Sequence, residues 1–268
     1  MSMKQTLNTS ALVTADSPKG QRATETFRGQ YNKAELDEDS GQRLNEHPGF
    51  SVYLAEGIRR FSAKAPDYNL VQSLLGVDFI TPEDVAKARG ITYTNEMLLA
   101  YGNSLPSVSH LEWCYTNGMI LVPGPASPTA LLGVRDLKAG YFYSKTGGWY
   151  ANDNEKFSRN DKVEAGWLAL LKKEVTGSLN ENWSSQKGLV VAPMIVPNAG
   201  EATWGLTTYK AVRGIELHPN IYVRTSSVDS DGNHVNIGFN PEGLNVNYWY
   251  DAFLGIGVAG ARKWALKS

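Results

Sequence analysis

The chain has 268 residues, of which 42% are hydrophobic and 20% charged, and its net charge is −1. These values are typical of a globular protein with a sizeable core, and they argue against a nucleic-acid-binding protein, which carries a basic patch. The single cysteine, Cys114, excludes an internal disulfide and a multi-cysteine metal site. We therefore expect no cofactor and no bound metal.

No apolar stretch approaches the length of a membrane-spanning helix, and the first twenty residues lack the continuous apolar segment of a secretory signal. We expect synthesis in the cytoplasm and no insertion of the chain into a membrane. Display outside the cell would then need another route, such as a virus particle, and display on a virus particle or a cell surface stays possible.

Residues 1–46 are polar, mixed in charge and nearly free of aliphatic periodicity. Such a composition buries too little apolar surface to offset the entropy lost on ordering. We expect a flexible N-terminal arm, with an extended strap on the domain as the alternative. Residues 47–268 are expected to form a single domain.

Three short helices are predicted between residues 80 and 118. Thr81 is expected to cap the first, which ends at Gly90. Thr94 caps the second, which stops at Gly102, and the third, in "SVSHLEWCYTNG", ends at Gly118. Capping residues and terminal glycines recur at helical spacing, which indicates a helical segment in the first half of the chain.

After this segment the chain is rich in Gly, Pro and aromatic residues, and only short strands are predicted. In "VEAGWLALLKKEV" (163–175), Gly166 and Trp167 interrupt a helical stripe and favour a strand. Further strands are expected in "TWGLTTYKAVRG" (203–214), "NIYVRTSSV" (220–228) and "NHVNIGF" (233–239). The predicted class is α+β, loop-rich with short antiparallel strands, preceded by a helical segment.

The stretch "DSDGN" at 229–233 is predicted to be a tight turn between two strands. Asp229, Asp231 and Asn233 have the spacing of a calcium loop, but the later bidentate Glu is missing. A hairpin turn is therefore favoured, and a calcium role for Asp229 and Asp231 stays open.

The stretch "GIGVAG" at 255–260 has the spacing of a dinucleotide-binding turn. Such a site needs a following helix and an acidic residue about 20 positions on, whereas only eight residues follow Gly260. We instead predict a terminal strand, "IGVAGARKWAL" (256–266), in which Val258 and Trp264 face the core.

Residues 236–255 have an unusual composition, with many Asn and Tyr residues and no lysine. Most of them have codons that differ from an asparagine codon only at adenines, a route that never yields Lys, Glu, Gln, Met or Trp. The residues of this kind are Asn236, Ile237, Phe239, Asn240, Asn245, Asn247, Tyr248, Tyr250, Asp251, Ala252, Phe253, Leu254 and Gly255. The residues between them, Pro241, Glu242, Gly243, Val246 and Trp249, are expected to be fixed, with Trp249 turned inward.

The string "SSVDSDGNHVNIGFNPEGLNVNYWYDAFLGIGVAGARKW" (226–264) resembles the variable region of proteins diversified by retroelements, in which mutagenic reverse transcription rewrites adenines of selected codons. The resemblance extends over roughly the last half of the chain. It implies a C-type lectin fold of the formylglycine-generating-enzyme type, with a variable region of about 234–256 facing the solvent. The paired cysteines of the enzyme branch are missing, so the resemblance implies the scaffold without the chemistry.

The leading hypothesis is a non-enzymatic ligand-binding protein whose ligand is a protein or a cell-surface structure. Tyrosines supply rigid contact area and Asn residues adaptable hydrogen bonds, as in antibody paratopes. One alternative is a structural or receptor-binding component of a virus particle or cell surface, attached through its N-terminal arm. A third hypothesis is an enzyme with an unrecognised site near "GGWYANDN" (147–154). The ligand's identity and the oligomeric state stay open.

Overall fold

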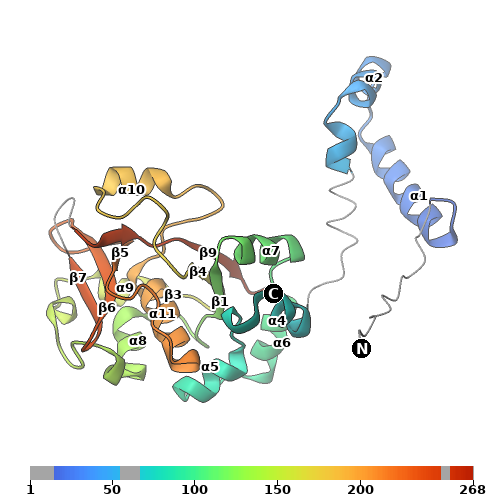
Figure 1. The fold of residues 1–268 in the computed structure, drawn as a ribbon. Coiled ribbons are helices and arrows are strands. Elements are labelled where there is room, and N and C mark those ends of the chain that lie inside the picture. The colour runs from blue at the N-terminus through green and yellow to red at the C-terminus, as the bar shows by residue number, and fades with distance from the viewer. Residues whose placement is uncertain (1–14, 55–66, 249–253, 268) are drawn as a thin grey trace, which may run out of the picture. The chain divides into compact units, whose positions relative to one another are not determined.

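The computed structural model describes residues 15–54, 67–248 and 254–267, which are coloured in Figure 1. The chain divides into two compact units, Met1–Ala63 and Lys64–Ser268. The second unit combines helices with short, mostly antiparallel strands, which confirms the α+β class. Within the described ranges, no helix has both the length and the apolar character needed to cross a membrane.

The described part of the first unit is helical in α1 (Pro18–Lys33), α2 (Glu38–Glu46) and residues 50–54. The side chains of Ser17 and Asp37 cap α1 and α2 by accepting hydrogen bonds from backbone amides in the first turn, at 3.2 and 2.7 Å. The sequence pattern does not predict these helices, because their apolar residues are too sparse to give a strong periodic signal. Residues 18–46 therefore differ from the extended strap considered above.

The second unit begins with helices and continues with alternating strands and helices. Its helices are α4 (Tyr68–Leu75), η1 (Gly76–Asp78), α5 (Pro82–Arg89), α6 (Asn95–Asn103), α7 (Val108–Thr116), α8 (Leu131–Leu137), η2 (Ala139–Tyr141), η3 (Trp149–Ala151), α9 (Phe157–Asn160), α10 (Trp183–Leu189) and α11 (Ala199–Arg213). Its strands are β1 (Met119–Pro123), β2 (Thr129–Ala130), β3 (Lys162–Val163), β4 (Gly166–Leu171), β5 (Tyr222–Val228), β6 (His234–Asn240), β7 (Gly243–Tyr248), β8 (Ile256–Val258) and β9 (Ala261–Ala265).

The three predicted helices α5, α6 and α7 are confirmed, and their ends follow the local capping chemistry. Thr81 caps α5 in a reciprocal capping box, and Gly90 ends the helix in the left-handed conformation. Thr94 caps α6 as expected. Two stops were misplaced: α6 continues one residue past Gly102, and α7 ends two residues before Gly118.

The strands form two main sheets. One has the order β1-β4-β9 and is antiparallel throughout. The other has the order β7-β6-β5-β8 and is antiparallel except for β8, which runs parallel to β5. The strands predicted in 163–175, 220–228 and 233–239 are confirmed as β4, β5 and β6. A third, two-stranded sheet joins β2 and β3.

The strand predicted in 203–214 is wrong, because these residues belong to the helix α11. Its start is fixed by a capping box between Asn198 and Glu201. Every residue from Ala199 to Tyr209 is buried. A helix buried on all sides has no amphipathic period, and its threonines favour strands locally, so the pattern could not identify it.

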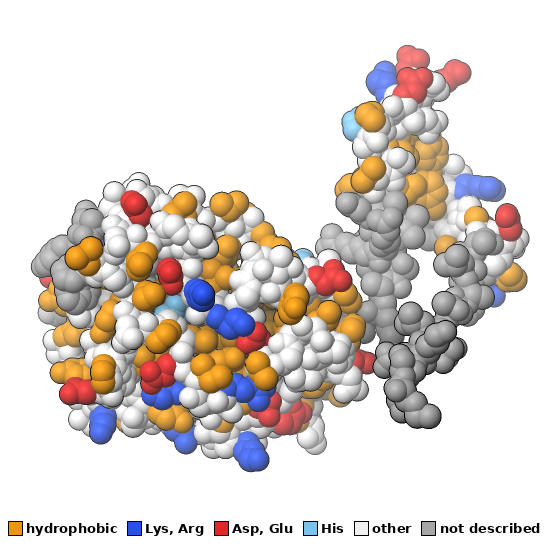
Figure 2. Space-filling model, in the orientation of Figure 1, with side chains coloured by type: hydrophobic (Ala, Val, Ile, Leu, Met, Phe, Trp, Pro, Cys, Tyr) orange, Lys and Arg blue, Asp and Glu red, His pale blue; other side chains and the backbone are white. Residues whose placement is uncertain are grey.

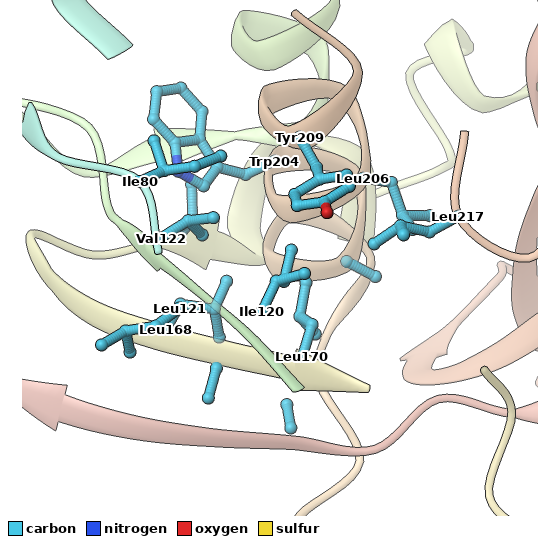
Figure 3. Close-up of a cluster of buried hydrophobic side chains, with 14 of the residues drawn as sticks. Ile80, Ile120, Leu121, Val122, Leu168, Leu170, Trp204, Leu206, Tyr209 and Leu217 are labelled. Atoms are coloured by element: carbon cyan, nitrogen blue, oxygen red, sulfur yellow. The ribbon is translucent and has the colours of Figure 1, made fainter. Parts of the chain in front are cut away.

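The core of the second unit lies between α11 and the sheet that contains β1 and β4. Figure 3 shows Trp204, Leu206 and Tyr209 of α11 beside side chains from β1 and β4. The indole N–H of Trp204 also donates to the carbonyl oxygen of Pro123 at the end of β1, at 2.8 Å. The strands β5 and β6 also contact α11.

The predicted terminal strand 256–266 is split into two strands that belong to different sheets. β8 pairs with β5, and β9 pairs with β4. Val258 is fully buried as expected, whereas Trp264 is half-buried at the edge of the core. The chain crosses between the sheets at Ala259 and Gly260, so the closing segment fastens one sheet to the other.

Candidate ligand-binding surface

Residues 236–255, which were singled out by their composition, include most of β6 and all of β7, the two strands on one side of the four-stranded sheet. β6 and β7 make a hairpin in which Asn240 pairs with Gly243 across a two-residue turn. β8 follows on the far side of β5. The residues between β7 and β8 therefore connect the two edges of this sheet.

β7 alternates between buried and partly exposed residues, as expected for a half-buried strand. Leu244 and Val246 are buried, while Asn245 and Asn247 are half-buried on the opposite face. Tyr248, at the end of the strand, is 36% exposed. Val246, expected to be fixed, therefore faces the core, and its two asparagine neighbours do not.

Trp149 supports this end of β7. Its indole N–H donates to the carbonyl oxygen of Val246 at 2.8 Å. Its ring meets the ring of Tyr248 edge to face, with the centroids 4.7 Å apart and an interplanar angle of 74°. The backbone N–H of Tyr143 donates to the carbonyl oxygen of Leu244 at 3.0 Å. Backbone groups on the outer edge of β7 are thus paired with the segment 143–149.

Asn180 holds the chain at the start of β8. Its side-chain oxygen accepts a hydrogen bond from the backbone N–H of Gly255 at 2.8 Å. Its own backbone N–H donates to the carbonyl oxygen of Ile256 at 3.0 Å. The described residues on both sides of 249–253 are therefore anchored by side chains from distant segments.

A buried polar network connects β5, α10 and β8 near this anchor. The Arg224 guanidinium, 2% exposed, donates to the side-chain oxygen of Gln186 at 2.8 Å. The Gln186 amide in turn donates to the carbonyl oxygens of Ser178 and Ile256, at 2.8 and 3.0 Å. Buried polar groups rigidify a structure when they are hydrogen-bonded in this way.

Three candidate residues are not on the surface. Asn236, Ile237 and Phe239 are at most 1% exposed, so the expectation that they face solvent is wrong. The physical reason for the burial of Ile237 and Phe239 is that they belong to the hydrophobic core, where β6 contacts α11. Within the described ranges neither polar atom of the Asn236 carboxamide has a hydrogen-bond partner.

The other candidates are placed as follows. Asn240 is half-buried, and its side-chain oxygen accepts from the backbone N–H of Glu242 at 2.9 Å, which is turn chemistry. Leu254 is 81% exposed and Gly255 half-buried. Four candidates, Tyr250, Asp251, Ala252 and Phe253, lie outside the described residues, as does the expected inward anchor Trp249.

The turn at 229–233 is confirmed, and the carboxylate of Asp229 accepts its hydrogen bonds from other residues of the turn. Asp229 accepts hydrogen bonds from the backbone amides of Asp231 and Asn233 and from the Asn233 side chain, at 2.7 to 3.0 Å. Glu155 holds the same turn through the backbone and hydroxyl of Ser230. Among the described residues, no group of three metal-binding side chains is found here or elsewhere.

Cys114 and His218 are buried groups without an evident role in binding. Burial raises the pKa of the Cys114 thiol to about 12, which disfavours the thiolate needed for nucleophilic chemistry. Burial lowers the pKa of His218 to about 4. Both side chains therefore behave as neutral core residues near pH 7.

The residues that anchor this surface are not evident in the sequence. Trp149 lies in the aromatic stretch "GGWYANDN", which the sequence singles out only as the possible enzyme site of the third hypothesis. Asn180 and Arg224 carry no local signal, because their partners lie 38 to 75 positions away in the chain.

Comparison with known protein families, curated proteins and solved structures finds no match for this chain.

Proposed function

We propose that the chain is a non-enzymatic binding protein whose ligand surface consists of Asn245, Asn247 and the exposed strand end Tyr248 of β7, Leu254, Gly255 and the residues between them. In this proposal the scaffold is of the C-type lectin type, and the surface is diversified by retroelement mutagenesis. The ligand is a protein or a cell-surface structure. The resemblance and the codon pattern of residues 236–255 support the proposal from the sequence.

The observation that carries the proposal is the division of β7 by burial. Of the residues expected to be fixed, Gly243 and Val246 in β7 are buried, whereas Pro241 and Glu242 in the preceding turn are exposed. Residues expected to vary, namely Asn245, Asn247, Tyr248 and Leu254, are half-buried or exposed. A surface that changes its side chains without losing its fold needs this separation, because substitutions away from the core usually change stability little.

Burial also reduces the number of positions that we propose to vary. Asn236, Ile237 and Phe239 pack inside the sheet, where most substitutions would leave a cavity or bury a polar group. We therefore exclude these three residues from the set of variable positions, which then begins at Asn240. The aromatic and amide side chains there suit a macromolecular ligand, since rigid rings give contact area and amides adapt their hydrogen bonds.

The experiment is deep sequencing of the coding region for residues 220–268 in a natural population of the source genome. We expect substitutions to concentrate at adenines in the codons for 240–255, with a near-copy of this region beside a reverse-transcriptase gene. Substitutions spread evenly over 220–268, with no such copy, would overturn the proposal.

A binding measurement completes the test once sequencing identifies natural variants. The triple variant Tyr248→Ala/Tyr250→Ala/Phe253→Ala is expected to melt close to the parent and to lose binding to cells that the parent binds. Unfolding of this variant would contradict the assignment of these residues to a surface.

A further inference from the structure

Helix α1 of the first unit carries a narrow apolar stripe. Ala23, Phe27, Tyr31 and Ala34 follow one another at spacings of four, four and three, so they lie on one side of the helix. The rings of Phe27 and Tyr31 are 6.3 Å apart, and Phe27 is 45% exposed. Figure 2 shows hydrophobic side chains at the surface of this unit.

The described part of this unit, residues 15–54, buries few side chains that could hold the helix. Among the described side chains of residues 15–54, all are exposed or half-buried except Gly20. Phe27, Leu36, Val52 and Tyr53 are large hydrophobic residues with 41 to 76% of their surface exposed. Helices of this length are marginal alone in water, and small units without a core usually need an external staple such as oligomerisation.

The width of the stripe indicates what covers it. A helix that docks on a globular core presents a broad apolar face, whereas paired helices share a narrow seam. The stripe on α1 occupies a single line of residues. A second helix therefore fits it better than a broad hydrophobic groove.

The charges of the unit fall into a basic segment followed by an acidic segment. Residues 18–34 hold four basic residues and one acidic residue, a net charge of +3. Residues 35–46 hold five acidic residues and one basic residue, a net charge of −4. In the described part of the chain no ion pair joins these two segments. Such a pattern suits pairing between two copies, because the basic helix of each finds the acidic segment of the other.

The same charges argue against a membrane as the occupant. Helices that bind anionic lipid surfaces carry an excess of Lys and Arg on their polar face. Residues 15–54 together hold five basic and seven acidic residues, so the acidic segment after α1 offsets the basic charge of this helix and weakens its attraction to an anionic bilayer.

We propose that a second copy of this chain covers the stripe, and that α1 pairs two molecules through Phe27 and Tyr31. This inference stands apart from the proposed ligand surface, which lies in the second unit. Its consequence is bivalence: each assembly presents two copies of that surface, so a weak ligand contact gains avidity on a target that carries several ligands.

The test is sedimentation equilibrium of the full chain over a range of protein concentrations. Wild type is expected to be dimeric, and Phe27→Glu/Tyr31→Glu is expected to weaken the dimer at least tenfold. The control Gln21→Glu/Asn32→Glu adds the same charge on the other side of α1 and should keep the dimer. Raising the salt from about 50 mM to about 300 mM should weaken the wild-type dimer by screening its complementary charges.

A cross-linking experiment tests the same pairing without charge substitutions that could unfold α1. Cys114 is buried, so a cysteine placed on the stripe by Phe27→Cys should form an intermolecular disulfide on mild oxidation, while Gln21→Cys should not. A wild-type chain that stays monomeric at all concentrations would overturn the inference, as would a dimer that Phe27→Glu/Tyr31→Glu leaves intact. Monomers that sediment with vesicles of phosphatidylserine and phosphatidylcholine would assign the stripe to a membrane instead.

Discussion

The indole of Trp149 lies against the ring of Tyr248, with their centroids 4.7 Å apart, and donates a hydrogen bond to Val246 two residues earlier. One fixed side chain thus holds the backbone of β7 and one face of a residue that we propose to vary. Tyr248 keeps 36% of its surface exposed, and this exposed part is what we propose contacts a ligand. Trp149 contacts the ring of Tyr248, but its hydrogen bond goes to a backbone carbonyl. The hydrogen bond that holds β7 therefore does not require a tyrosine at position 248.

Replacing Trp149 should therefore cost more stability than replacing Tyr248. Trp149→Phe keeps an aromatic ring but leaves the Val246 carbonyl without its donor, which we expect to cost about 1 kcal/mol. Trp149→Ala removes the ring contacts as well and should cost about 3 kcal/mol. Tyr248→Ala should cost less than about 1 kcal/mol, because the side chain is partly exposed. Urea unfolding of the three variants checks the order, and equal losses for Trp149→Ala and Tyr248→Ala would contradict it.

The parts of this fold that follow local rules could be predicted from the sequence. The cap of α5 depends on Thr81 and Asp84, which are three residues apart, and β4 was recognised from the Gly166–Trp167 interruption. The turn at 229–233 also makes its own hydrogen bonds. In each case the residues that decide the structure are neighbours in the chain.

The parts that failed depend on distant contacts. α11 is buried on all sides, so no periodic face distinguishes it from a strand. The contact of Trp149 with Val246 spans 97 positions, and a single sequence contains no sign of it. The burial of Phe239 follows from its place in the hydrophobic core, where β6 contacts α11, and composition gives no sign of that contact.

The buried and exposed candidates should respond differently to the same substitution. Phe239→Ala removes a side chain that is 1% exposed and should destabilise the protein by about 3 to 5 kcal/mol. Asn247→Ala, on the outer face of β7, should change stability by less than about 1 kcal/mol. Thermal and urea unfolding of both variants provides the measurement. A mild effect of Phe239→Ala would return that residue to the set of variable positions.

Asn236 offers a sharper variant of this comparison. Its carboxamide is fully buried, and within the described ranges it has no hydrogen-bond partner. Because an unpaired buried polar group costs about 1 to 3 kcal/mol, Asn236→Leu, which is similar in size, should leave stability unchanged or raise it. A large loss of stability on urea unfolding would show that the amide makes an important interaction, and Asn236→Ala separates this effect from loss of packing.

The stability of the fold should fall in mild acid because of His218. Burial lowers its pKa from the ordinary 6.5 to about 4, so between these values the unfolded chain binds a proton that the folded chain does not. Stability is therefore retained above about pH 6.5 and decreases as the pH falls toward 4, by up to about 3 kcal/mol. His218→Asn, which tolerates the positive φ of 52° at this position, should flatten the pH dependence. His47→Asn, at an exposed site, is the control, and an unchanged pH profile in His218→Asn would refute the assignment.

Gly255 and Gly257 mark the boundary between the proposed variable surface and the fixed strand. A Cβ at Gly257 would lie 2.6 Å from the Cβ of Glu174, so any side chain there must displace β8 or its neighbour. A Cβ at Gly255 would meet nothing within 4 Å, and its φ of +82° is one that asparagine adopts more readily than most residues. We expect Gly255→Asn to cost about 1 kcal/mol or less and Gly257→Asn to cost well above 3 kcal/mol or to prevent folding. Expression yield and urea unfolding measure both. Because asparagine codons are the proposed starting point of diversification, a strongly destabilised Gly255→Asn would remove position 255 from the variable set and move its boundary back to Leu254.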